Sequence, residues 1–203
     1  MNNLFFTSDL HLGHESVITK MGRQGFRDIG EHDLAILDNI NHMVGIRDFL
    51  YILGDFAWGS YAEKYRGMIK CKNITFIIGN HDKRMSCKKA FGEYQDIKVI
   101  RKFGPNGEKA VLCHYPMLYW PGSHHNDYHF YGHEHSNREA TMDKLLPDRR
   151  SMDVGVDNAY RMLGDYRPFS REELLWFLQN RPGHDPLSFY KALNDARQSA
   201  ANG

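Results

Sequence analysis

The feature that most constrains the fold of this chain is a series of short apolar runs, each followed at once by polar residues. The runs are Leu4–Thr7, Phe49–Leu53, 74–78, Ala110–Cys113 and 153–156. Each is only four or five residues long and is bounded by polar residues or glycine, and Phe, Ile, Val and Leu dominate them, as in buried β-strands. The sequence therefore predicts several short buried strands.

Helical periodicity lies between the first two runs. The apolar residues of 33–44 recur at steps of three or four, on one face of a helix: Leu34, Leu37, Ile40 and Val44. A second helix is predicted over 61–69. Strands thus alternate with helices early in the chain, whereas 103–156 has the pattern of strands and loops. This order predicts an α/β fold with mixed sheets.

The C-terminal part carries helix signals of its own. Ser170 followed by Glu173 has the spacing of a capping box, and the apolar residues behind it support a helix that Pro182 ends. The tail over 188–200 is also predicted to be helical, with frayed ends. No repeat, low-complexity linker or domain boundary interrupts the sequence. We therefore predict a single domain over 1–203, with the helices of 170–200 packed on it or partly frayed.

Composition and charge narrow the class of protein. The 203 residues carry a formal net charge of +1, so no strong overall field would attract nucleic acid or a membrane. The three cysteines are widely spaced and form neither a disulfide framework nor a CxxC zinc motif, which favours a reducing cytoplasm. The sequence shows no signal-peptide pattern and no apolar run of membrane-spanning length. We expect a cytoplasmic protein that does not bind membranes.

Five polar clusters come at the ends of the predicted strands, in the order SDLHLGH, LGDF, IGNHD, LCHYP and YGHEH. In open α/β sheets the carboxyl ends of the strands tend to line one crevice, so these clusters are predicted to converge. Their donors are imidazole nitrogens, carboxylate oxygens and one amide oxygen, without a thiolate. That set suits Mn, Fe, Co, Ni or Zn and does not suit an iron–sulfur centre.

The spacing within two clusters supports a shared site. Asp9 and His11 are two positions apart, so on an extended segment both side chains would face the same side. The same parity holds for His133 and His135, and it directs Glu134 away, so Glu134 is not a predicted ligand. Glycines at 54, 79 and 132 would let the backbone bend sharply or approach a ligand closely.

Each cluster alone has an ordinary explanation. DxH, GD and HxH often occur by chance, and such residues commonly serve as helix caps, turn residues or core histidines. GNHD is rarer and carries more information. The joint occurrence of all five clusters, in this order and each after an apolar run, is what favours a metal site over those roles.

The order D-x-H, GD, GNHD, H and GH-x-H resembles the calcineurin-like metallophosphoesterase superfamily. All five blocks are present without substitution and span residues 9–135. The flanking stretches TSDLHLGH, LYILGDFAWG, IGNHDKR, LCHYPM and MDVGVDN are similar to a small branch of short predicted phosphoesterases. The resemblance implies a four-layer fold, in which two mixed β-sheets are sandwiched between helices.

The resemblance also implies two divalent metal ions, with Mn²⁺ as the first choice and Fe, Zn, Ni or Co as alternatives. The ligands of one metal would be Asp9, His11, Asp55 and His135. Those of the other would be Asp55, Asn80, His114 and His133, so that Asp55 bridges the pair. A bridging carboxylate holds two cations about 3.5–4 Å apart, and a hydroxide shared by both would be the nucleophile.

The same resemblance gives His81 and Asp82 catalytic roles. In this family the histidine of GNHD faces the substrate, where it can stabilise the transition state or protonate the leaving alkoxide. Asp82 would accept a hydrogen bond from the other imidazole nitrogen, which would fix the ring and raise its pKa. A structural turn histidine is the alternative for His81.

Three further residues are candidate substrate contacts: His14, Arg84 and Arg27. Each also has an ordinary role as a solvated loop residue. Arg23 and Arg27 lie in a glycine-containing loop that could cover the crevice, and here a plain surface role is favoured. His124 and His125 follow no family motif and are expected to be exposed and inert.

These features predict a binuclear-metal phosphoesterase that hydrolyses a phosphomonoester or phosphodiester. A small phosphorylated molecule, a nucleotide or a short nucleic acid end is the expected substrate. The near-zero net charge argues against long duplex nucleic acid, whose binding would need many Lys and Arg contacts. The alternative is a catalytically silent metal-binding scaffold of the same fold, which would bind a protein partner without turnover.

Overall fold

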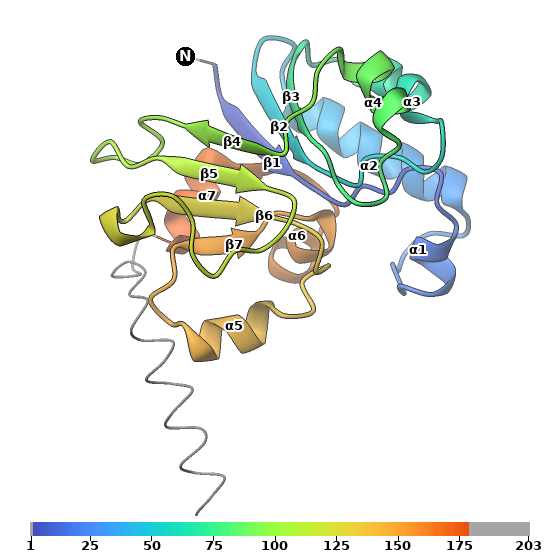
Figure 1. The fold of residues 1–203 in the computed structure, drawn as a ribbon. Helices are drawn as coiled ribbons and strands as arrows, with labels where there is room; N and C mark the ends of the chain where they lie inside the picture. The colour runs from blue at the N-terminus through green and yellow to red at the C-terminus, as the bar shows by residue number, and fades with distance from the viewer. Residues whose placement is uncertain (1, 179–203) are drawn as a thin grey trace, which may run out of the picture.

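A computed structural model describes residues 2–178, and two four-stranded β-sheets form its frame (Figure 1). The strands of the first sheet lie in the order β3 (Asn73–Ile77), β2 (Phe49–Leu53), β1 (Leu4–Thr7) and β8 (Phe169–Ser170). Those of the second lie in the order β4 (Ile97–Ile100), β5 (Ala110–Cys113), β6 (Tyr128–Tyr131) and β7 (Ser151–Asp153). Each sheet has one antiparallel pairing, β1 with β8 and β4 with β5, beside two parallel ones.

A core of large apolar side chains lies between the two sheets. Phe6 of β1 contacts Phe130 of β6 and Phe103, with ring centroids 5.7 Å apart in both pairs. Alternate residues of β5 share this core, because Ala110 and Leu112 belong to it. Burying such side chains contributes about 1.5–3 kcal/mol each, so the packing fixes the two sheets against each other.

Helices cover the sheets on the outside (Figure 1). The outer face of the first sheet packs against α2 (Ile29–Met43), α3 (Ala62–Met68) and α4 (Arg84–Phe91). The remaining helices are α1 (Ser16–Thr19), α5 (Glu139–Leu145), α6 (Val156–Leu163) and α7 (Arg171–Leu178). The predicted fold class, two mixed sheets sandwiched between helices, is confirmed. None of the helices within residues 2–178 combines the length and apolarity needed to span a bilayer.

The predicted elements agree best with the observed ones where a single apolar run forms a single strand. The bounds of β1, β2 and β5 match the predicted runs, and β3 begins one residue earlier. The strand predicted over 153–156 is wrong, because β7 ends at Asp153 and α6 begins at Val156. The side chain of Asp153 accepts a hydrogen bond from Gly155 N (2.6 Å), and its carbonyl accepts one from Asn158 Nδ2 (2.6 Å). These contacts turn the chain where periodicity suggested a longer strand.

Helix starts follow capping chemistry. The helix predicted over 33–44 begins earlier, at Ile29, because the Asp28 side chain accepts a hydrogen bond from Glu31 N (2.9 Å). The capping box is confirmed: Ser170 N donates to Glu173 Oε2 (2.8 Å) and Glu173 N donates to Ser170 Oγ (3.2 Å). The predicted helix end at Pro182 and the helix over 188–200 lie outside the described residues, and the single domain over 1–203 stays a prediction.

Candidate metal centre

The predicted polar clusters converge beyond the carboxyl ends of the central strands. Backbone hydrogen bonds join the loops there: Asp9 N donates to Gly54 O (3.0 Å) and His11 N to Asp55 O (2.9 Å). Gly132 N likewise donates to His114 O (2.9 Å). The convergence of the loops expected from the strand ends is therefore present.

Left-handed backbone conformations set the direction of the site side chains. Asp9 (φ 57°), His11 (φ 50°) and Asp55 (φ 52°) adopt them, and so do His133 (φ 74°) and His135 (φ 48°). Such non-glycine conformations cost about 1–3 kcal/mol each and gather at functional sites. The extended conformation assumed for Asp9–His11 and His133–His135 is therefore wrong, although each pair still faces one site.

The first ligand group consists of Asp9, His11 and His135, whose ligand atoms lie within 4.8 Å of one another. Asp9 Oδ1 is 3.9 Å from His11 Nε2 and 3.8 Å from His135 Nε2. The two imidazole Nε2 atoms face each other at 3.3 Å. Three donor atoms gathered this closely form a group that could hold a metal ion.

The second group centres on His114 and Asn80. His114 Nε2 lies 3.0 Å from Asn80 Oδ1, and His133 Nδ1 lies 2.9 Å from the same oxygen. Asp55 Oδ2 is 3.5 Å from His114 Nε2 and 3.6 Å from His11 Nε2, so this carboxylate lies between the two groups. All seven predicted ligands are thus brought together. Asp9 also falls within reach of the second group, in a set with Asp55 and His114.

An unsatisfied atom shows that these residues fit a cation. Asp9 Oδ1 is buried and has no hydrogen-bond partner among the described residues, whereas Asp9 Oδ2 accepts a bond from His133 N (2.9 Å). A buried carboxylate oxygen without a partner is costly, and burial raises the pKa of Asp9. A divalent cation beside Oδ1 would supply the missing partner.

The comparisons with known proteins agree with this geometry. A model of the family described as "Calcineurin-like phosphoesterase" matches residues 3–191. The chain belongs to this family. Members of the calcineurin-like phosphoesterase family typically use divalent metal ions, and the two ligand groups provide candidate sites for them.

Similar proteins come from Methanocaldococcus jannaschii, Mycobacterium phage L5 and Aquifex aeolicus. "Uncharacterized protein MJ1445" of Methanocaldococcus jannaschii is 29% identical over 182 residues, which cover 88% of this chain and 93% of that protein. The "Gene 66 protein" of Mycobacterium phage L5 is 36% identical over 86 residues, 40% of this chain and 41% of the phage protein. The crystal structure of "the Protein of Unknown Function AQ665 from Aquifex aeolicus" matches with a TM-score of 0.66 and 25% identity, covering 87% of this chain and all of that one.

Hydrogen bonds on the far side of two imidazoles orient their Nε2 atoms toward the centre. His114 Nδ1 donates to Leu53 O (2.7 Å), and His135 Nδ1 donates to Asp157 Oδ2 (2.6 Å). These assignments leave Nε2 unprotonated in each neutral ring and able to bind a metal. A carboxylate behind a histidine ligand also raises the basicity of the ligand.

Asp157 and Arg23 form a buried support that the sequence analysis missed. Arg23 donates to both oxygens of Asp157, from Nε (2.9 Å) and Nη2 (2.8 Å), and Arg23 Nη1 also donates to Leu10 O (2.9 Å). The Arg23 side chain is only 1% exposed. The surface role favoured for Arg23 is therefore wrong, because its guanidinium lies beneath the site and connects α6 to the loop after β1.

Asp82 has a different role from the predicted one. Its carboxylate accepts hydrogen bonds from three backbone amides: Gly79 N (2.8 Å), Asp55 N (2.8 Å) and Phe56 N (3.0 Å). These bonds occupy the buried carboxylate within the described structure, so the prediction that Asp82 orients the His81 ring is wrong. Asp82 instead ties the GNHD loop to the loop that carries Asp55.

His81 and His14 lie at the open side of the centre. The His81 ring is exposed, and its centroid is 5.3 Å from that of His11 and 6.1 Å from that of His14. His81 N donates to Asp55 Oδ1 (2.9 Å), which fixes the backbone that carries this ring. The His14 ring stacks on Trp58, with centroids 3.9 Å apart, so His14 is part of the site entrance.

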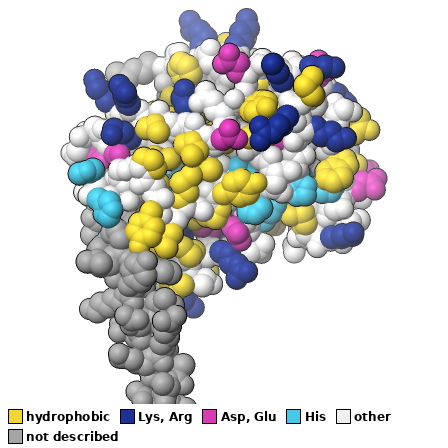
Figure 2. All heavy atoms as spheres, viewed as in Figure 1, with side chains coloured by type: hydrophobic (Ala, Val, Ile, Leu, Met, Phe, Trp, Pro, Cys, Tyr) yellow, Lys and Arg dark blue, Asp and Glu magenta, His cyan; other side chains and the backbone are white. Residues whose placement is uncertain are grey.

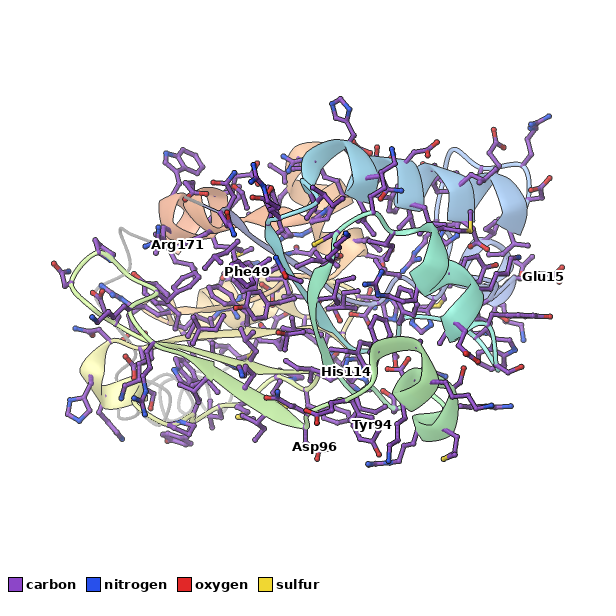
Figure 3. All side chains as sticks on the ribbon, turned by 90° about the horizontal axis from the view of Figure 1, so that it is seen from above. Glu15, Phe49, Tyr94, Asp96, His114 and Arg171 are labelled. Carbon is purple, nitrogen blue, oxygen red and sulfur yellow. The ribbon has the colours of Figure 1, made fainter. Side chains whose placement is uncertain are left out.

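The other candidates lie in different surroundings. The Arg84 guanidinium donates to Tyr94 Oη (3.2 Å) at the start of α4, and Figure 3 shows Tyr94 beside that helix. Arg27 is exposed and pairs with Glu31 (3.1 Å). These contacts do not test substrate binding by Arg84 or Arg27, which stays a prediction. Glu134 Oε2 lies 3.8 Å from Arg138 Nε, and Glu134 belongs to neither ligand group.

The charged groups of the centre shift one another's pKa values strongly. Burial alone would raise the pKa of Asp55, but the hydrogen bond and charge of His114 lower it to about 2. Burial would lower the pKa of His114, but Asp55 and Asp9 raise it to about 9. Burial has the largest effect on His11: it lowers the pKa of this imidazole to about 2 and favours the neutral, metal-binding form.

Figure 2 shows exposed histidines together with hydrophobic side chains on one face of the molecule.

The motif glycines are required by close packing against the ligands. A Cβ on Gly79 would lie 2.2 Å from Asp55 Oδ1 and 2.5 Å from Asp55 N. A Cβ on Gly132 would lie 2.2 Å from Asp9 Oδ2. The predicted close approach is thus an approach to the ligand carboxylates themselves.

We predict that Gly79→Ala weakens metal binding by about 10–100-fold, because the added methyl group displaces Asp55. The measurement is a calorimetric Mn²⁺ titration of the folded variant. Gly67→Ala is the matched control, since a Cβ there meets no atom within 4 Å. Equal Mn²⁺ affinity in the two variants would contradict the role given to Gly79.

Proposed function

We propose that this chain hydrolyses a phosphomonoester or phosphodiester with two divalent metal ions, of which Mn²⁺ is the first choice. The observation that carries the proposal is the position of Asp55, whose Oδ2 lies 3.6 Å from His11 Nε2 and 3.5 Å from His114 Nε2. One buried carboxylate between two imidazole groups supports a two-metal centre. The unpartnered Asp9 Oδ1 supports it independently.

The protein residues would hold and orient the reacting groups. Two bound cations would supply Lewis acidity toward phosphate oxygens and lower the pKa of a bound water. Asp9, His11 and His135 would hold one ion, and Asn80, His114 and His133 the other, with Asp55 contacting both. The hydrogen bonds to Leu53 O and Asp157 direct the Nε2 atoms of His114 and His135 toward the centre, where they would bind the ions.

His81 would provide the proton for the leaving oxygen. Its ring lies on the open side of the centre, beside His11 and Trp58 (5.3 and 6.0 Å between centroids). A substrate phosphate at the metals would therefore place its leaving group near this imidazole. General acid catalysis of this kind contributes typically 10²–10⁴-fold in rate. Because Asp82 is occupied by backbone amides, the His81 backbone bond to Asp55 is the contact that positions it.

The substrate is proposed to be a small phosphorylated molecule, a nucleotide or a short nucleic acid end, and the protein is proposed to act in the cytoplasm. A net charge of +1 supports a small substrate over long duplex nucleic acid.

The proposal is tested by hydrolysis of p-nitrophenyl phosphate and bis-(p-nitrophenyl) phosphate with added Mn²⁺. We expect metal-dependent turnover that EDTA abolishes and that His81→Ala lowers by about 10²-fold or more. His124→Ala is the control, because His124 is an exposed histidine in the turn Ser123–His125. No turnover with Mn²⁺, Ni²⁺ or Zn²⁺ would sink the proposal and indicate a silent scaffold.

A further inference from the structure

An open hollow of about 580 Å³ lies beside the candidate metal centre. Its walls come mainly from the loop before α1, the segment that leads into α3 and α3 itself, and they include His14, Trp58, Tyr61 and Lys64. Glu15 also lines it, and Figure 3 shows this residue at the edge of the molecule near α1. None of the proposed metal ligands lines the hollow, so it is a neighbouring space with its own chemistry.

Ring contacts make the hollow continuous with the centre. The His14 ring lies 5.5 Å from the ring of His11, a proposed metal ligand, and stacks on Trp58 at 3.9 Å with an interplanar angle of 10°. The Trp58 ring is also 6.0 Å from the His81 ring. A phosphoester bound at the metals would therefore extend its organic part along His81 and His14 toward Trp58.

The hollow presents flat aromatic surface to solvent. Trp58 is 43% exposed and Tyr61 is 50% exposed, so both rings offer part of their surface to solvent. The neighbouring Tyr65 is buried, and its hydroxyl donates to the Asp33 carboxylate, which also accepts from Gly13 N (2.9 Å). This network fixes Tyr65, whose ring centroid lies 6.3 Å from that of Tyr61, so it holds the part of the wall beside Tyr61.

The charges of the hollow nearly cancel. Lys64 Nζ lies 4.7 Å from the Tyr65 ring centroid and 5.8 Å from that of Tyr61, while Glu15 supplies one negative charge. A second phosphate group would find little net attraction here. An uncharged planar ring with hydrogen-bond donors and acceptors fits better, because it can stack on the aromatic side chains and bond to Lys64 and Glu15.

We infer that this hollow binds the nucleobase of the substrate, stacked on Trp58, so that the substrate class is a phosphate ester of a nucleoside. The inference rests on the proposed function, since it assumes that the phosphate lies at the metals. Stacking on an aromatic side chain tolerates every base, because each has a π-face. Discrimination between bases would come from the polar groups at the rim, Lys64 and Glu15.

The test compares two non-hydrolysable ligands on the Mn²⁺-loaded protein by calorimetry: the phosphonate analogue of AMP and that of ribose 5-phosphate, which lacks the base. We expect the base to tighten binding by about tenfold or more. Trp58→Ala should remove that difference, and Trp58→Phe should restore most of it. Trp176→Ala is the matched control, because Trp176 is an exposed tryptophan on α7 outside the hollow.

Equal affinity for the two ligands in the wild-type protein would overturn the inference, and so would a base preference that survives in folded Trp58→Ala protein. If turnover of bis-(p-nitrophenyl) phosphate persists in either case, the proposed phosphoesterase function stands and only the nucleobase site fails. Conversely, Trp58-dependent binding of the AMP analogue without turnover of any phosphate ester would contradict the proposed function and leave the nucleobase site supported.

Discussion

Asp55→Asn is expected to lower kcat/KM for phosphate ester hydrolysis by about a thousandfold or more. The neutral amide can still accept the hydrogen bond that His81 N makes with Oδ1, so the loop geometry should persist. What it loses is the negative charge that lies between His11 and His114 and would neutralise two cations. Activity is measured with bis-(p-nitrophenyl) phosphate over a range of Mn²⁺ concentrations.

Asp38→Asn serves as the control for this prediction, because it makes the same change at an exposed position of α2. Mn²⁺ should raise the free energy of unfolding of both the wild-type protein and the control. The gain should be about 2.7 kcal/mol per site at an Mn²⁺ concentration of a hundred times the Kd. Asp55→Asn should lose most of that gain. Full activity and a full Mn²⁺ effect in Asp55→Asn would show that Asp55 does not bind the metals.

Asp157→Asn is expected to reduce both stability and metal affinity. The substitution leaves the Arg23 guanidinium buried without its bidentate carboxylate, which costs about 3 kcal/mol. For a chain of this size, that corresponds to a fall in Tm of roughly 6–12 °C. His135 also loses the carboxylate behind its Nδ1, so Mn²⁺ affinity should fall by about 10–100-fold.

The pH dependence of this loss provides an internal check. Burial alone would raise the pKa of Asp157, but the charge of Arg23 and the hydrogen bond from His135 lower it below the ordinary 3.8. The folded protein therefore holds this proton less readily than the unfolded chain. The contribution of Asp157 to stability is present above pH 3.8 and is lost as the pH falls through its folded value. In buffer without metal ions, the difference in free energy of unfolding between wild type and Asp157→Asn should narrow as the pH falls below 3.8. A difference that widens there would contradict the assignment.

The sequence predicts which residues gather at the candidate centre, because several of them follow a recognisable strand. Asp9, Asp55 and His114 lie within two residues of the ends of β1, β2 and β5, and the bounds of these strands follow from their apolar runs. Once the sheets form, the ends of the strands bring the side chains together without further information. The residue order therefore carries both the fold class and the position of the candidate centre.

The supporting residues could not be predicted in the same way, because their roles depend on contacts between distant segments. Arg23 and Asp157 are 134 positions apart and meet only when α6 packs beneath the loop after β1. Asp82 is next to His81 in sequence, which suggested a bond between them, yet the loop turns its carboxylate toward the amides of Asp55 and Phe56. The left-handed backbone at Asp9 is likewise set by the fold and is not visible in residue spacing. The glycine-containing loop around Arg23 suggested a surface role, and residue spacing does not show that this arginine is buried.

The most direct test of the two-metal proposal is a crystal structure of Mn²⁺-loaded protein with anomalous diffraction data. We predict two anomalous peaks that share Asp55 as a ligand. One would contact Asp9, His11 and His135, and the other would contact Asn80, His114 and His133. A single peak, or two peaks without a common contact to Asp55, would contradict a binuclear centre at this site.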